Sequence, residues 1–279
     1  MHIIYRNCIS QVLSMSKIAF IVEGKKTEKV VIKSFMDNFM NSNNFDELDI
    51  EEIVLPMETN IYTLYKKMKE YDFFEDLDII NIIEEVFKSK GKSFEGYKKN
   101  TFGEIYLFFD YDRHANDVDN HDDIIDEMLD IFDNETENGK LFISYPMIEA
   151  VKDFSDEICK EYDECRIRIE DFSKYKNLVS KRATKTDFRK YDKDTWKFII
   201  NNFIVKTSCL FDKRYNYNYD FYINNVVPRS IYDKQMEKFF KVDSSVMILS
   251  AIPEFIIDYL GRRVFEDNFR YKYCDNYIK

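Results

Sequence analysis

The stretch KIAFIVEGKKTEKVVIKSF, residues 17–35, begins as an apolar run that stops at Glu23 and then changes to an amphipathic pattern of helical spacing. The same event recurs in GEIYLFFDYD, residues 103–112, where a second apolar run stops at Asp110 and Asp112. Acidic side chains that end two apolar strands need an explanation, because charged groups are rarely placed next to a core without a purpose or a partner. This pair of stretches therefore decides both the fold and the candidate site.

Around these two stretches, apolar strands alternate with helical segments up to about Val151, a pattern typical of βαβ units. Four strands are expected, at 18–22, 52–55, 105–109 and 141–144. We expect an α/β fold in which helices flank a parallel four-stranded sheet. The segment between the second and third strands is too long for a simple crossover, and it predicts a helical insertion at about residues 60–100.

Beyond Glu149 the strand pattern stops and helical periodicity dominates, as in KDTWKFIINNFIVK and SVMILSAIPEFIIDYLG. The sequence therefore predicts two domains, a sheet-containing domain at 15–152 and a mainly α-helical C-terminal domain at 153–279. The segment KRYNYNYDFYINN, residues 213–225, is biased toward Tyr and Asn and is expected to be a loop whose tyrosines pack into the core.

Composition sets limits on the class of protein. No window approaches the roughly 18 uncharged apolar residues of a membrane-spanning helix. Five cysteines are scattered without a CxxC or Cys/His pattern, so neither a zinc site nor a disulfide framework is expected, and a reducing cytoplasmic location is the default. The net charge of −11 has the wrong sign for general electrostatic binding of nucleic acid. Any nucleic-acid role therefore needs a local basic surface, metal ions or a partner.

In an open parallel sheet, functional groups gather beyond the carboxyl ends of the strands. If the first and third strands are neighbours, Glu23, Asp110 and Asp112 converge in one cleft, where a hard divalent cation such as Mg²⁺ would neutralise them. Residues two apart in an extended segment point to the same side, so Tyr111 is expected to point away. Gly24 permits a sharp turn and close approach of a phosphate to the following helix.

These residues resemble the Toprim family, which is found in topoisomerases, bacterial primases and OLD-type nucleases. Its hallmark is a glutamate, commonly followed by glycine, at the end of the first strand, and a DxD at the end of a later strand. FIVEGKKTE and LFFDYD match that pattern over roughly residues 17–149. The resemblance implies Mg²⁺-dependent making or breaking of phosphodiester bonds, with Glu23 as general acid/base and Asp110 and Asp112 as metal ligands; Mn²⁺ is an alternative ion.

Within that family the chain is most similar to stand-alone Toprim effectors of bacterial antiphage defence, such as the nuclease subunit of the PARIS system. The similar features are the helical insertion, SYPMIEA after the fourth strand and a C-terminal region ending near LSAIPEFIIDYLG. This resemblance implies a toxic nuclease that an ABC-type ATPase partner controls. GKKT superficially suggests a P-loop, but the required earlier glycine is Ala19, so the chain is not expected to be the ATPase itself.

Several other residues are candidates with two interpretations each. Glu149 is either a further metal ligand or part of a helix's first turn, and Lys152 either stabilises a transferring phosphate or lies on the surface. Lys25 and Lys26 either contact substrate phosphate or are ordinary residues of a first helical turn. A basic region is either a solvated surface or a nucleic-acid-binding patch; its residues are Lys181, Arg182, Lys185, Arg189 and Lys190.

Three functions remain open from the sequence. The first is a metal-dependent nuclease that acts on RNA, such as tRNA, or on DNA. The second is a primase-like nucleotidyl transferase, which the same acids would support but which would need added nucleoside triphosphates. The third is a non-catalytic regulatory or assembly subunit whose acids only bind a structural ion. A homo-oligomer is compatible with each.

Overall fold

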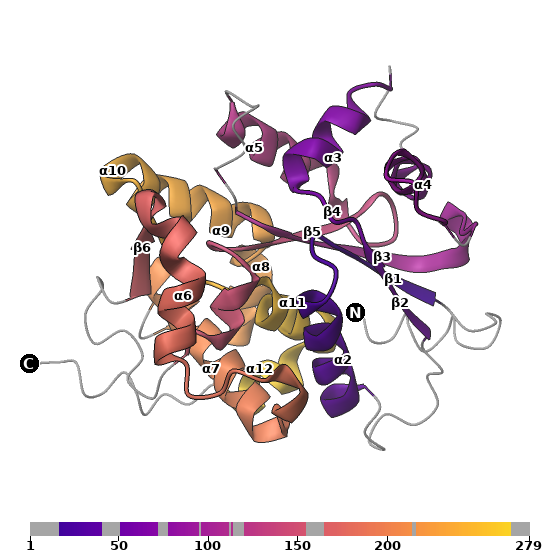
Figure 1. Ribbon diagram of the computed structural model, residues 1–279. Coiled ribbons are helices and arrows are strands. Elements are labelled where there is room, and N and C mark those ends of the chain that lie inside the picture. Colours follow the sequence, from indigo (N-terminus) through magenta and orange to yellow (C-terminus); the bar gives the residue numbers. More distant parts are fainter. Residues whose placement is uncertain are drawn as a thin grey trace, which may run out of the picture.

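A mostly parallel sheet of five strands forms the centre of the protein (Figure 1). The structure is a computed structural model, and it describes residues 17–40, 51–71, 78–94, 96–111, 113, 120–154, 165–213 and 216–268. The strand order is β2-β1-β3-β5-β4, with β1, β2, β3 and β5 parallel and the two-residue β4 antiparallel to β5. The sheet strands are β1 (Lys17–Val22), β2 (Glu51–Pro56), β3 (Phe102–Asp110), β4 (Asp133–Asn134) and β5 (Gly139–Ser144).

The α/β fold with a parallel sheet is thus confirmed, and the four predicted strands are present. The expected number of four strands is wrong by one, because β4 adds a short antiparallel edge. The predicted inserted helices are α3 (Ile61–Met68) and α4 (Ile79–Ser89). Both have side-chain caps that explain where they begin: Asn60 accepts a hydrogen bond from the Thr63 N–H, and Asp78 accepts one from the Ile80 N–H.

Helices cover both faces of the sheet. In Figure 1, α3, α4 and α5 (His121–Ile131) lie above it, and α2 (Thr27–Phe39), α7 (Lys193–Leu210) and α11 (Ala251–Leu260) lie below it. The other helices of the described residues are α6 (Phe172–Arg182), α8 (Tyr219–Asn225), α9 (Pro228–Gln235), α10 (Lys241–Asp243) and α12 (Arg262–Asn268), with a π-helical turn at Met236–Phe240 joining α9 to α10. The described part of the chain also forms 3-10 turns at Lys99–Thr101, Ile148–Lys152 (η3), Ile169–Asp171 and Phe188–Lys190.

A single cluster of buried apolar side chains joins the sheet to the helices that follow Lys152. Phe255 of α11 is fully buried, and its ring centroid lies 4.8 Å from that of Tyr106, 5.5 Å from those of Phe20 and Phe108, and 5.9 Å from that of Phe142. Rings from β1, β3 and β5 therefore close around one residue of a late helix. The predicted division between residues 152 and 153 stays a prediction.

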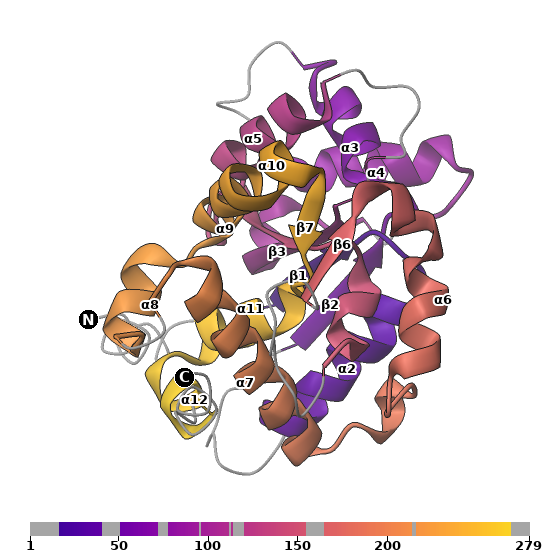
Figure 2. The same cartoon turned by 90° about the vertical axis from the view of Figure 1, so that its left-hand side faces the viewer.

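A second, two-stranded sheet was not expected. It pairs β6 (Arg166–Arg168) with β7 (Ser245–Met247) in antiparallel register, and Figure 2 shows the two strands side by side with α6 close to them. The region beyond Glu149 was predicted to be mainly helical, and this short strand pair is an addition to that prediction. The predicted loop at 213–225 is wrong in its second half, which forms α8, although its Tyr217 and Tyr222 are buried as expected.

The cysteines differ from expectation in one respect. Cys165, just before β6, is disulfide-bonded, whereas the scattered spacing had predicted no disulfide. Cys209 of α7 is a free, buried thiol. No helix within the described ranges is long and apolar enough to cross a membrane.

Candidate functional site

The carboxyl ends of β1 and β3 lie side by side, as the sequence predicted, because Val22 pairs with Phe108 in parallel register. The chain leaving β1 stays attached to β3, since the Glu23 N–H donates to the Phe108 carbonyl at 3.2 Å. The Asp110 N–H donates to Glu23 Oε2, also at 3.2 Å. The structure therefore brings Glu23 and Asp110 together at the end of the sheet.

The Asp110 carboxyl group accepts a backbone hydrogen bond and lies close to other carboxylates. Its Oδ1 accepts a hydrogen bond of 2.8 Å from the Ile148 N–H, which fixes the direction of the carboxyl group. Burial raises the pKa of Asp110 well above its usual value, and the carboxylates of Glu23, Glu28 and Glu149 raise it further, while the Ile148 hydrogen bond acts in the opposite direction. Asp112, the second acid of the predicted pair, lies outside the described residues. Tyr111 is fully buried away from this site and contacts Tyr145 and Phe172.

Glu28 belongs to this group, although the sequence analysis did not select it. Its side chain is only 6% exposed, and its Oε1 accepts the Gly24 N–H at 2.8 Å. Burial raises the pKa of Glu28, backbone hydrogen bonds lower it, and the Glu149 carboxylate raises it. The available signal was its position in the first turn of a helix that starts directly after Glu23, but there an acid also fits the helix dipole.

Gly24 has a different role from the one predicted. It is not among the glycines with a left-handed backbone, so the turn itself does not demand glycine. A Cβ at this position would instead lie 2.5 Å from both carboxylate oxygens of Glu28. The glycine leaves room for that carboxylate, which also occupies the Gly24 N–H that had been expected to face a phosphate.

Glu149 approaches the same group from η3, beyond the end of β5. It is 5% exposed, and its Oε1 lies 3.1 Å from Lys176 Nζ of α6. Lys176 is thus the cation that α6 brings to the acids, a contact over 27 residues that spacing alone does not reveal. Lys152, expected near the reacting phosphate, places its Nζ 4.4 Å from the centroid of the Phe188 ring. Burial lowers the pKa of Lys152.

Four carboxylates, those of Glu23, Glu28, Asp110 and Glu149, define what we call the acid cluster. Carboxylate oxygens are the ligands that Mg²⁺ takes, and their mutual repulsion favours a cation. Among the residues that the structure describes, however, no three His, Cys, Asp or Glu side chains are grouped closely enough to hold a metal ion. The donor chemistry therefore fits Mg²⁺, but the described side chains do not form a ligand set.

Lysines gather on the β2 side of the acid cluster. Glu58, two residues after β2, has a left-handed backbone with φ of 54°, and its carboxylate lies 3.4 Å from Lys25 Nζ and 2.6 Å from Lys92 Nζ. Lys90 donates to the carbonyls of Met57 and Glu58 at 2.8 and 2.6 Å. Three ammonium groups and one carboxylate therefore lie together beyond the end of β2, the strand that pairs with β1. Lys90 and Lys92 were not predicted, and Lys26 is exposed beside Lys25.

The predicted basic region is exposed, and much of it is paired locally. Arg182 Nε donates to Asp153 Oδ1 at 2.7 Å, Lys185 donates to Thr195, and Arg189 Nε donates to Asp187 Oδ1 at 2.8 Å. Lys181 and Lys190 are exposed on the same surface. These contacts agree with a solvated surface for most of the region and leave its nucleic-acid role untested.

The chain matches no protein-family model, no curated protein and no solved structure. The resemblance to the Toprim family therefore rests on the two strand-end motifs alone.

Proposed function

We propose that the chain is a metal-dependent nuclease of the Toprim kind. The observation that carries this proposal is the meeting of the Glu23 and Asp110 groups at the carboxyl ends of neighbouring parallel strands, with Glu28 and Glu149 close enough to raise the pKa of Asp110. An uncompensated group of acids at such an edge is a common place for cation-dependent chemistry. The lysines around Glu58 and Lys176 on α6 lie on either side of it and suit the phosphates of a substrate strand.

In this proposal Glu23, Asp110 and Asp112 would hold Mg²⁺, with Glu149 as a further candidate ligand. The ion, when bound, would neutralise the scissile phosphate and activate water. Glu23 exchanges protons with the water and the leaving oxygen, and the Asp110 N–H fixes one of its carboxylate oxygens. Asp110 is oriented by the Ile148 N–H.

The substrate class and the biological setting follow from the resemblance. We propose RNA, such as tRNA, or DNA as substrate, and a role as toxic effector in antiphage defence under the control of an ABC-type ATPase. The chain's net charge of −11 supports a partner that brings substrate to the acid cluster or restrains it.

The test is cleavage of labelled RNA and DNA by the purified chain, with Mg²⁺ or Mn²⁺ and with the partner ATPase present. Wild type should cleave one of the two without added nucleoside triphosphates, and Glu23→Gln, Asp110→Asn and Asp112→Asn should each lose activity by at least about a hundredfold. Glu137→Gln, an exposed acid of the β4–β5 turn, is the matched control. Activity retained in all three site variants would refute the mechanism, and activity that requires nucleoside triphosphates would favour the primase-like alternative.

A non-catalytic metal-binding subunit is the second candidate. It is favoured by the bonds that satisfy these acids within the chain, such as Gly24 N–H to Glu28 and Lys176 to Glu149. This alternative predicts thermal stabilisation by Mg²⁺ without turnover under any condition.

A further inference from the structure

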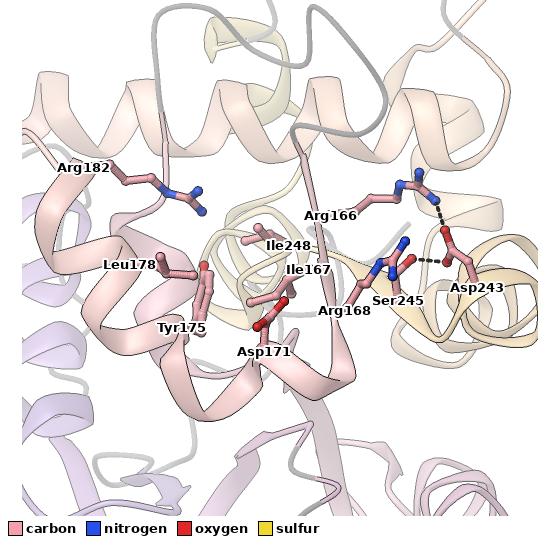
Figure 3. Close-up of a pocket in the computed structure, with 10 residues that line it drawn as sticks. All are labelled: Arg166, Ile167, Arg168, Asp171, Tyr175, Leu178, Arg182, Asp243, Ser245 and Ile248. Atoms are coloured by element: carbon pink, nitrogen blue, oxygen red, sulfur yellow. Dashed lines mark hydrogen bonds and ion pairs between the residues drawn. The ribbon is translucent and has the colours of Figure 1, made fainter.

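A cavity of about 430 Å³ lies between α6 and the β6–β7 pair, outside the acid cluster (Figure 3). This volume falls within the range of ligand pockets, roughly 300–1,000 Å³. Three arginines belong to its lining: Arg166 and Arg168 come from one strand, two residues apart, and Arg182 comes from the last turn of α6. We call this the arginine pocket.

Acidic side chains hold the guanidinium groups in place, and two acids, Asp243 and Asp171, belong to the lining of the cavity themselves; Asp171 is paired with Lys174 at 2.7 Å. Arg166 donates to Asp243 at 2.9 Å and stacks over the Phe239 ring, and Asp243 is held in turn by the Ser245 hydroxyl. Arg182 is held by Asp153, and Figure 3 shows its side chain extending from α6 toward the cavity. Arg168 is the least constrained, because Glu170 Oε1 lies 3.8 Å away and both side chains are mostly exposed. The pocket thus combines two oriented guanidinium groups with one exposed cation.

Part of the lining is apolar. Ile167, Ile248 and Tyr175 are buried there, and Leu178 of α6, one turn before Arg182, is 42% exposed. A ligand that fills this cavity would therefore place an anionic group against the arginines and a flat or apolar group against Leu178. A phosphate joined to a nucleoside has both parts.

The net charge of the segment around the pocket also favours an anionic ligand. Residues 166–190 contain nine basic and three acidic side chains, a net charge of +6 in a chain whose total is −11. The helix α6 carries no acid from Phe172 to Arg182, and on another of its faces Lys176 reaches Glu149 of the acid cluster. The helix α6 therefore borders both the arginine pocket and the acid cluster.

We propose that the arginine pocket binds a nucleotide unit of a single-stranded nucleic acid, with its phosphate on Arg168 and Arg182 and its base or ribose on Leu178. A free nucleotide offers the same chemistry, and the experiment separates the two sources. The proposed binding does not require the acid cluster to be catalytic, but it deepens the nuclease proposal by giving the flanking part of the substrate a site.

The test measures binding of three probes to the full chain by fluorescence anisotropy and competition, without metal so that no cleavage intervenes. The probes are a labelled ten-nucleotide oligouridylate, uridine 5′-monophosphate and inorganic phosphate. Arg168→Gln and Leu178→Glu should each weaken binding of the oligonucleotide by about tenfold. Arg263→Gln, an exposed arginine of α12 outside the pocket and outside the basic region, should leave binding within about twofold.

Each outcome decides the proposal. Tight binding of the oligonucleotide with weak competition by the mononucleotide supports a nucleic-acid strand, and equal competition per nucleotide assigns the pocket to a free nucleotide instead. Equal loss in Arg168→Gln and Arg263→Gln, no binding, or competition by inorganic phosphate as strong as by uridine 5′-monophosphate would overturn it. Cleavage that persists while the pocket variants bind like wild type refutes the pocket alone. Pocket-dependent binding by a chain that never cleaves refutes the nuclease alone.

Discussion

At the scale of single residues, the Asp110 carboxyl group lies close to the carboxylates of Glu23, Glu28 and Glu149. Replacing it by Asn keeps the acceptor for the Ile148 N–H but removes the charge that Glu23, Glu28 and Glu149 oppose. We therefore expect the metal-free Asp110→Asn protein to melt at the same temperature as wild type or up to about 4 °C higher at pH 7. Differential scanning calorimetry measures this.

The control for that experiment is Asp133→Asn, an exposed acid in β4, which should not shift the melting temperature by more than about 1 °C. A melting temperature of Asp110→Asn that falls by several degrees would mean that the Asp110 carboxylate is paired favourably in the folded protein, and the proposed crowding would be wrong.

Gly24 tests whether Glu28 matters for function. The Cβ of Gly24→Ala would meet the end of a flexible side chain, so the Glu28 carboxylate moves and loses the Gly24 N–H at small cost in stability. We expect a change in melting temperature of less than about 4 °C but at least tenfold slower cleavage. A double-mutant cycle with Glu28→Ala checks the cause: the two effects should not add, whereas additive effects would show that Gly24 acts independently of Glu28.

At the scale of elements, α11 contains a buried acid whose ionisation should lower the free energy of unfolding. Glu254 is 3% exposed, and its Oε1 has no hydrogen-bond partner among the described residues. Burial raises the pKa of Glu254 well above its usual value, Asp258 raises it further and Lys140 lowers it. Other groups near it are the phenols of Tyr145, Tyr217 and Tyr222, whose pKa values the Glu254 charge raises.

A carboxyl group whose pKa is higher in the folded than in the unfolded chain costs stability as pH rises from the unfolded value of about 4.3 to the folded value. Below that window the group is protonated in both states and costs nothing. Glu254→Gln removes the titration, so its advantage in melting temperature over wild type should be smallest near pH 4 and grow toward pH 8. Glu137→Gln, exposed in the β4–β5 turn, should show no such trend; a pH-independent difference for Glu254→Gln would contradict the assignment.

The elements that were predicted share one property, a long local pattern. The four predicted strands, β1, β2, β3 and β5, are each at least six residues long, and each contains the apolar run from which it was predicted. The pairs that were missed are two and three residues long, β4 with β5 and β6 with β7, so period-two alternation could not mark them. α8 was taken for a loop because Tyr and Asn dominate it, yet Asn218 caps it by accepting the Phe221 N–H.

The part of the candidate site that lies at strand ends was predicted from the sequence, and the part that helices and loops contribute was not. Glu23 and Asp110 end strands, so sheet geometry alone brings them together. Glu28, Lys92 and Lys176 depend on which helix or loop packs where, and such contacts have no local signature. The arginine pocket joins a strand to a helix end 14 residues later, and only folding shows that both face one cavity.

At the scale of the whole molecule, charge distribution predicts dependence on a partner. With a net charge of −11, the isolated chain should meet a polyanion slowly. We expect little cleavage by the chain alone and strong cleavage when it is expressed with the proposed ATPase partner and challenged by phage. Growth curves and sequencing of nucleic-acid ends measure both. Equal cleavage with and without the partner, or strong cleavage by the pair without infection, would refute partner control.

The position of Phe255 has a consequence for how the chain is made. The rings of β1, β3 and β5 that surround it are synthesised first, and α11 follows about a hundred residues after β5. At roughly 5–20 residues per second, a ribosome needs about 5–20 s to add that length. During this time the rings that contact Phe255 lack its cover, so the nascent chain should depend on chaperones more than a protein whose core closes locally.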